Sequence, residues 1–256
     1  LERGYALPGM FIVGTDSHTP SYGCIGAFSC GVGASDMLSI WATGKLWFQV
    51  PESAKLILNG RLPKGVFAKD VILSVIRDET ASGCNYFCAE FSGEAVKEMS
   101  IAERFVLANL SVEMGVKATY VEVDAMTRQY ADRVGSRYQV IVPDSDANYK
   151  KRRVVDVSGL VPLAACPHAV DNVRPVSDLV GTEIQQAFIG TCASGRVEDL
   201  EIASDILRGK RIAPNVRLLV APASRYVMEK ASEAGYLQTL IKAGATLVTP
   251  GCGPCA

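Results

Sequence analysis

Three cysteines have the residue type and spacing to bind a metal centre. Cys192 lies in the glycine-flanked segment Gly190-Thr-Cys-Ala-Ser-Gly195, and the other two form Cys252-Gly-Pro-Cys255. Thiolates are soft ligands that suit zinc or iron–sulfur clusters. A cubane cluster has four iron corners, so three cysteines would leave one iron open to water or substrate. An open iron is a Lewis acid, whereas a fully ligated cluster only carries electrons, so the count of three indicates an enzyme rather than an electron carrier.

Other roles for these cysteines stay open on the residues alone. Free cysteine is among the most buried residue types, so for Cys192 by itself a packing role is the simpler interpretation. The Cys252-x-x-Cys255 motif suits zinc, a redox dithiol or a cluster. A structural zinc site usually has four protein ligands. Cys84-x-x-x-Cys88 offers more thiols, but it lies in a different predicted unit, and we interpret both residues as packing.

Predicted parallel strands precede both cysteine segments. The sequence predicts strands at 186–190, 216–221 and 246–248. One helix is predicted between the first two strands, near 198–207, and two between the second and third, near 226–234 and 237–243. Strands that alternate with helices of about ten residues indicate a layered α/β fold. Such folds place their sites at the carboxyl ends of the strands. Cys192 and Cys252 are therefore expected at one edge of a sheet.

A second group of residues has the types needed for acid–base chemistry. Thr15-Asp16-Ser17-His18 follows an apolar run at 11–14 that reads as a strand. A histidine in such a loop can act as a general acid or base once a carboxylate fixes its tautomer. Ser100-Ile-Ala-Glu103 matches a capping box that opens a helix. On that helix Asn109 and Glu113 are spaced i, i+4 and are expected on one face.

Composition excludes several classes of protein. The 256 residues are 48% hydrophobic with a formal net charge of −1, and Lys150-Lys-Arg-Arg153 is too short a basic run for a nucleic-acid site. Eight cysteines in this length do not make a disulfide scaffold. No signal peptide and no 18-residue apolar run is evident in the sequence. We expect a soluble cytoplasmic protein with reduced thiols and with neither a nucleic-acid nor a membrane partner.

The organisation along the chain predicts three parts. A charged, turn-rich stretch at 143–156 is the strongest candidate boundary, and a strand is predicted just before it, at 138–142. The expected parts are the end of a first α/β domain (1–51), a second α/β domain (52–150) and a third that carries the cysteines (151–256). The chain starts without Met and stops just after Cys255, which we interpret as a fragment.

Five motifs in order resemble one family. Gly14-Thr-Asp-Ser-His-Thr19 is similar to a signature of the aconitase superfamily, and Phe91–Gly115 resembles the large subunit of 3-isopropylmalate dehydratase and homoaconitase. The segments around Cys192, Val216–Arg225 and Pro250–Cys255 match the same subunit. The resemblance implies three-layer α/β/α domains with mixed or parallel sheets. It also implies a hydro-lyase that removes and re-adds water on a small hydroxy di- or tricarboxylic acid.

The resemblance also implies roles for individual residues. Cys192, Cys252 and Cys255 would hold a [4Fe–4S] cluster with one open iron. His18 would work with Glu113 as the acid–base pair, and Asp16 would orient it. Three further residues would contact or border the substrate: Ser17, Asn109 and, after the first cysteine loop, Arg196.

The chain departs from the family pattern in places. The usual Ser-Cys-Thr-Asn of the first cysteine loop reads Thr191-Cys-Ala-Ser194 here. The family's N-terminal Asp-His pair and its swivelling domain, a separate small subunit in the isopropylmalate-type enzymes, are not in this sequence, so a small-subunit partner is expected. Alternative functions are a related hydratase acting on methylmalate or maleate, a cluster-free RNA-binding protein, or a zinc or redox module.

Overall fold

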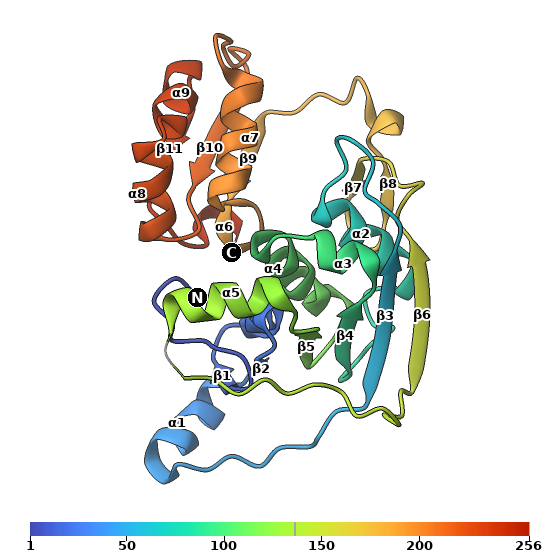
Figure 1. Ribbon diagram of the computed structural model, residues 1–256. Helices are drawn as coiled ribbons and strands as arrows, with labels where there is room; N and C mark the ends of the chain where they lie inside the picture. The colour runs from blue at the N-terminus through green and yellow to red at the C-terminus, as the bar shows by residue number, and fades with distance from the viewer. Residues whose placement is uncertain (136, 256) are drawn as a thin grey trace. The chain divides into compact units, whose positions relative to one another are not determined.

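The computed structural model describes residues 1–135 and 137–255. The chain divides into two compact units, unit 1 (Leu1–Val180) and unit 2 (from Gly181 onward). Each is described by itself below and in Figure 1.

A four-stranded parallel sheet forms the centre of unit 1. Its strand order is β5-β4-β3-β6, with bounds Ala118–Val121, Cys88–Ser92, Ser53–Asn59 and Lys151–Asp156. Along β3, Ala54, Leu56 and Leu58 are fully buried and alternate with more exposed residues. The period of two means that one face of the sheet lies in the core. Helices α2 (Ala68–Glu79) and α4 (Ile101–Leu110) contribute to that core cluster, which Phe91 of β4 joins.

The first fifty residues of unit 1 form a smaller parallel pair. Strand β1 (Phe11–Gly14) pairs with β2 (Phe28–Gly31), and the 3-10 helix η1 (Thr19–Ile25) connects them. Helix α1 (Ala34–Thr43) follows and buries none of its residues. In Figure 1 a long extended segment joins α1 to β3. The remaining elements of unit 1 are α3 (Glu94–Glu98), η2 (Ser111–Met114), α5 (Ala125–Val134), β7 (Leu163–Ala165), β8 (Val173–Pro175) and η3 (Val176–Leu179).

The start of α4 shows how the sequence fixes a helix end. The Ser100 side chain accepts a hydrogen bond from the Glu103 backbone N–H (3.2 Å), and the Glu103 carboxylate accepts one from the Ser100 N–H (2.8 Å). This confirms the predicted capping box, which satisfies two otherwise unpaired backbone donors. The helix ends at Leu110, where η2 continues the chain to Gly115. Gly115 ends η2 with a φ of 83°, which favours glycine.

Unit 2 is a three-stranded parallel sheet with helices in its connections. The strand order is β11-β10-β9, with bounds Thr246–Leu247, Arg217–Ala221 and Gln186–Gly190. The helices are α6 (Thr191–Ser194), α7 (Val197–Leu207), α8 (Arg225–Glu233) and α9 (Tyr236–Ala243), and η4 (Gly253–Cys255) follows β11. Leu200, Val220 and Leu240 are fully buried where α7 and α9 pack on β10. The predicted strands and helices of this unit are confirmed within one or two residues.

The α/β fold class with parallel sheets is confirmed, but two predictions fail. Residues 138–142 form no strand, because Ile141 and Val142 lie in an extended segment with more than half of each side chain exposed. Strand β4 was not predicted, although all five of its residues are buried. The three-part division stays a prediction. In the structure, β6 pairs with β3 throughout its length and residues 151–180 belong to unit 1.

In the described residues, 1–135 and 137–255, no helix has the length and apolar character needed to cross a membrane.

Candidate active site

The loop after β1 carries the predicted acid–base residues and is held by its own hydrogen bonds. The Asp16 carboxylate accepts a bond from the His18 backbone N–H (2.6 Å), and the Asp16 carbonyl accepts one from the Thr19 hydroxyl (2.6 Å). The carbonyl of His18 accepts a bond from the Ser21 hydroxyl (2.5 Å). Pro20 then lies in the first turn of η1, where its missing N–H costs nothing. These bonds fix the backbone of the Asp16–His18 loop and leave its side chains at the surface.

His18 lies between three polar side chains. Its Nε2 atom is 3.6 Å from Oε1 of Glu113, and its Nδ1 atom is 3.2 Å from Oγ of Ser17 and 3.9 Å from Oδ1 of Asp16. The hydrogen bond with Glu113 raises the pKa of His18 above its ordinary value. Burial opposes this rise, and the charges of Glu113 and Asp16 add to it. The predicted pairing of His18 with Glu113 therefore exists as a contact in unit 1.

Asn109 supports the loop from below. Its side chain is 1% exposed, and its Nδ2 atom donates to Oγ of Ser21 at 2.8 Å. Ser21 in turn bonds the His18 carbonyl. The structure thus links Asn109 to the backbone of His18 through one hydroxyl. Asn109 and Glu113 do not sit on one regular helix face as expected, because α4 ends at Leu110 and Glu113 belongs to η2.

A polar pocket opens beside this loop. It has a cavity volume of about 360 Å³. Asp16 and Ser17 line one part of it, and Gly31, Gly33 and Asp36, at the end of β2 and the start of α1, line another. Lys117, which directly precedes β5, completes the charged lining. The pocket thus lies at the carboxyl ends of β1 and β2, the edge at which parallel sheets place their ligands.

The three predicted metal ligands all lie in unit 2. Cys192 falls in the short helix α6 after β9 and is partly buried, whereas Cys252 and Cys255 are exposed in the segment after β11. Since β9 and β11 both run parallel to β10, their carboxyl ends meet at the same edge of the sheet. The expected placement of Cys192 and Cys252 at one edge is therefore met.

Both cysteine segments lie near the same residue, Ala221 at the end of β10. A methyl group on Gly195 would lie 2.6 Å from the Ala221 carbonyl oxygen, and one on Gly253 would lie 3.8 Å from the Ala221 side chain. Only glycine allows the first of these approaches. Thr191, just before Cys192, has a φ of 68°. Such a left-handed conformation is strained for a β-branched residue and is often stored at functional sites.

The thiols of Cys192, Cys252 and Cys255 suit a soft metal ion, although in the described residues their side chains do not form a metal-binding group. In residues 1–135 and 137–255, no three His, Cys, Asp or Glu side chains form a group that could hold a metal ion. The eight cysteines all lie within the described residues, and none of them forms a disulfide. Cys24, Cys30, Cys84 and Cys88 are buried in unit 1, in line with the packing role predicted for Cys84 and Cys88. The chemistry of Cys192, Cys252 and Cys255 and their position after β9 and β11 fit a cluster.

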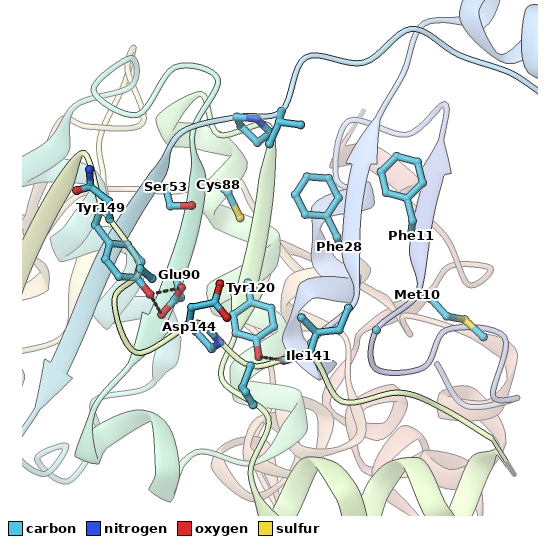
Figure 2. A pocket seen from close by; sticks show the side chains of 18 residues that line it. Met10, Phe11, Phe28, Ser53, Cys88, Glu90, Tyr120, Ile141, Asp144 and Tyr149 are labelled. Carbon is cyan, nitrogen blue, oxygen red and sulfur yellow. Dashed lines mark hydrogen bonds between the residues drawn. The ribbon is translucent and has the colours of Figure 1, made fainter.

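A second pocket in unit 1 differs from the first in both place and charge (Figure 2). It has a volume of about 480 Å³ and is lined by the first residue of each of four strands: Phe11, Phe28, Ser53 and Cys88. Figure 2 shows Phe11 and Phe28 on one side and Glu90 and Tyr149 on the other, with the Tyr149 hydroxyl donating to Glu90 (2.8 and 2.9 Å). Its charged lining residues are Glu90 and Asp144, so it disfavours an acid.

The structure brings together some of the predicted site residues. Asp16, Ser17, His18 and Glu113 form one cluster in unit 1, with Asn109 beneath it. Arg196 lies in unit 2 with the cysteines, where it opens α7 and donates its backbone N–H to Asp199 (2.9 Å). Sequence reasoning missed two residues: Ser21, whose hydroxyl ties Asn109 to the His18 backbone, and Lys117, which has no motif around it.

Three curated relatives match the whole chain. It is 48% identical over 255 residues to a "Probable methanogen homoaconitase large subunit" of Methanosarcina mazei, with 99% of this chain and 65% of the relative covered. It is 47% identical to "3-isopropylmalate dehydratase large subunit 2" of Archaeoglobus fulgidus (100% and 62% covered). It is 46% identical to "Homoaconitase large subunit" of Thermus thermophilus (100% and 60% covered). The chain thus spans three fifths to two thirds of their length.

A solved structure supports the fold, and a family model identifies the family. The crystal structure of Thermococcus kodakaraensis aconitase X in its holo-form matches with a TM-score of 0.51 at 13% identity, covering 96% of this chain and 58% of that one, which supports the fold alone. The model of the aconitase family (aconitate hydratase) matches residues 1–183 and 177–256. With these matches, and with the expected loop and thiols in place, the chain belongs to the aconitase family.

Proposed function

We propose that this chain is part of the large subunit of an iron–sulfur hydro-lyase. The enzyme would dehydrate and rehydrate a small hydroxy di- or tricarboxylic acid, such as 3-isopropylmalate or homocitrate. The observation that supports this best is the contact of His18 with Glu113 beside the polar pocket. The names of the relatives, which are large subunits of 3-isopropylmalate dehydratase and homoaconitase, support the same substrates.

In this proposal His18 gives a proton to the departing hydroxyl group, which leaves as water, and the small subunit would supply the base that takes the proton from the neighbouring carbon as the double bond forms. Hydroxide is a poor leaving group, so protonation by a positioned acid speeds its departure. Glu113 favours the protonated imidazole, because its hydrogen bond raises the pKa of His18 above the ordinary value, although burial of the ring opposes the rise. Efficient acid–base groups have a pKa close to the working pH. Asp16 orients the ring and its loop through the bond from the His18 backbone.

The other site residues would hold the substrate or the loop. Ser17 is exposed at the pocket and its hydroxyl can bond a carboxylate. Asn109, buried beneath the loop, would border the site and keep His18 in place through Ser21. Arg196 would add a guanidinium to the carboxylate contacts, since its planar fork matches that group.

Cys192, Cys252 and Cys255 would hold a [4Fe–4S] cluster as thiolates. When bound, an iron without a cysteine ligand is a Lewis acid that polarises the C–O bond of the substrate. The glycines at 190, 195, 251 and 253 let the backbone of this chain curl around a bulky group. We further propose a small-subunit partner and a place in cytoplasmic amino-acid biosynthesis such as that of leucine, in keeping with the relatives' names.

The test uses the full-length polypeptide co-expressed with a small subunit. Iron and acid-labile sulfide are measured with EPR spectra, and hydration of unsaturated di- and tricarboxylic acids is followed by ultraviolet absorbance. We expect a three-iron signal that converts to a four-iron cluster on adding ferrous iron, and activity that falls by a factor of at least about 100 in H18A. H168A is the matched control, since His168 lies outside the site, and it should retain activity.

Other outcomes separate the alternatives. Stoichiometric zinc without sulfide would indicate a zinc or redox module and would overturn the proposal. Salt-resistant retention on RNA by cluster-free protein would indicate the RNA-binding alternative. A full cluster with activity on methylmalate or maleate alone would keep the hydro-lyase chemistry and change the substrate.

A further inference from the structure

We propose that Lys117 binds a carboxylate of the substrate in the pocket beside Asp16 and Ser17. This inference rests on the proposed function, because it assumes that the pocket receives an acid. Lys117 belongs to none of the sequence motifs. It directly precedes β5 and so lies in a different part of the fold from the Asp16–His18 loop.

Gly31 connects the ammonium group of Lys117 to that loop. Its Nζ atom donates to the carbonyl oxygen of Gly31 at 2.8 Å, and Gly31 is the last residue of β2. The Gly31 backbone in turn packs against the loop. A methyl group on Gly31 would lie 3.0 Å from the carbonyl oxygen of Asp16 and 3.5 Å from Cα of Ser17. Gly31, Ser17 and Lys117 all line the same pocket.

The surroundings of Lys117 hold its side chain in place before any ligand binds. Its Nζ atom lies 5.7 Å from the ring centres of both Phe48 and Tyr86, within the range of cation–π attraction. The residue is partly buried, and its backbone N–H bonds the Phe87 carbonyl (2.8 Å). A lysine already ordered in this way loses less side-chain entropy on binding an anion than a mobile one.

The ammonium group still has donors to give. A lysine carries three N–H donors, and the Gly31 carbonyl takes one of them. Across the described residues, no carboxylate lies within ion-pair distance of Lys117. A partly buried cation without a carboxylate partner is unusual, because buried charges are normally paired. A substrate carboxylate would supply that missing partner.

The charge of the pocket supports the same role. Its ionisable lining residues are Asp16, Asp36 and Lys117. Asp36 already accepts a bond from the Gly33 N–H (3.1 Å) and caps the start of α1, so this helix end is not offered to a ligand. Without Lys117 the charged lining would be acidic only, and an acid would be repelled. The second pocket, with Glu90 and Asp144 and no lining Lys or Arg, has that unfavourable charge.

The test compares K117M with K117R and with K64M in the full-length large subunit. Lys64 is an exposed loop lysine outside both pockets and serves as the control. Calorimetry measures binding of two unreactive acids, succinate and tricarballylate, at fixed ionic strength. One charge-assisted hydrogen bond accounts for a factor of ten or more in affinity. We expect K117M to weaken binding at least ten-fold, K117R to stay within about three-fold, and K64M to match the wild type.

The same variants are assayed for turnover together with the small subunit. If Lys117 only binds a carboxylate, KM of K117M rises about as much as its affinity falls, while kcat changes less than about three-fold. Unchanged affinity in K117M, or no acid binding by the wild type, would overturn the proposal, even if the enzyme is an active hydro-lyase. Lys117-dependent acid binding by a protein that hydrates none of the acids would instead contradict the proposed function and leave this inference standing.

Discussion

The Nε2 atom of His18 lies 3.6 Å from Oε1 of Glu113, which joins the loop after β1 to the short helix after α4. Glu113 stabilises the charged imidazole, and the pKa of His18 is raised as a result. A raised pKa in the folded state means that this contact adds stability at pH values below the ordinary histidine pKa. That contribution is lost as pH rises through the raised value.

E113Q should therefore lower the pKa of His18 toward its ordinary value. The neutral amide cannot stabilise the imidazolium charge, while burial of the ring, which lowers the pKa, persists. With only two histidines in the chain, an NMR titration of the ring protons reads this directly. E98Q, at an exposed position on α3, is the control. A His18 titration that does not move in E113Q would contradict this account of the pair.

Gly23 should tolerate no side chain, because η1 packs its backbone onto β5. A methyl group there would lie 1.9 Å from the carbonyl oxygen of Thr119. We expect G23A to cost on the order of 1–3 kcal/mol of stability, as for other overpacked positions. Because His18 is the N-cap residue of η1, the shift should also move the His18 pKa. G159A, where an added methyl group meets nothing within 4 Å, is the control in thermal unfolding by circular dichroism.

Alkylation of cluster-free protein should separate the two exposed thiols from two buried ones. Cys252 and Cys255 are exposed and should react first with iodoacetamide. Burial raises the pKa of Cys84 to about 11, with Glu79 adding to it, and that of Cys88 to about 12, so little thiolate is present at pH 8. We expect these two to react at least about 100-fold more slowly. Peptide mass spectrometry measures the order, and early labelling of Cys88 would mean that β4 is not packed as described.

Arg104 and Asp124 form a bidentate pair whose loss should destabilise unit 1. Arg104 is fully buried, and its two terminal nitrogens donate to the two oxygens of Asp124 at 2.8 and 2.5 Å. D124N would leave a buried guanidinium without its counter-charge. Because the Asp124 side chain is 25% exposed, we expect a loss of about 2–3 kcal/mol, less than the roughly 3–5 kcal/mol for breaking a fully buried pair.

The pH dependence of the same pair has a definite sign. Burial alone would raise the pKa of Asp124, but hydrogen bonds from Arg104 and from the Thr127 backbone outweigh it, and the pKa is lowered. The pair therefore adds stability above the ordinary aspartate pKa and loses it as pH falls through the lowered value. Urea unfolding at a series of pH values should show this acid loss in the wild type and a weaker one in D124N. D205N, in an exposed pair with Arg208, should behave like the wild type.

Elements with a strong local signal could be predicted from the sequence. The apolar run at 11–14 predicts β1, and the Ser100–Glu103 capping box predicts the start of α4. Strand β4 escaped prediction because its polar centre, Glu90, breaks the apolar pattern. Glu90 is buried only because Lys55 (2.7 Å) and Tyr149 reach it from distant parts of the chain. The strand predicted at 138–142 is wrong for a different reason. These residues are largely apolar, but no strand pairs with them, so they form a loop.

Sequence motifs identified most residues of the candidate site, but they did not predict how these residues contact one another. The pairing of His18 with Glu113 came from the family resemblance, because nothing in the spacing of two separate segments fixes a contact between them. Asn109 is expected to border the substrate, and its hydrogen bond to Ser21 was not predictable because it depends on how η1 packs on α4. Lys117 carries no pattern at all. Its position follows from the turn at Gly115 and from two aromatic rings contributed by other segments.

Strand β6 has a consequence for how unit 1 folds during synthesis. The Glu79 side chain at the end of α2 is fully buried, and its counter-charges, Lys151 and Arg153, stand on β6, 72 and 74 residues further along the chain. Until β6 has left the ribosome and paired with β3, this carboxylate has neither ammonium nor guanidinium to offset its burial. Contacts so distant in sequence form slowly. A nascent chain that stops short of residue 151 would lack both counter-charges of Glu79.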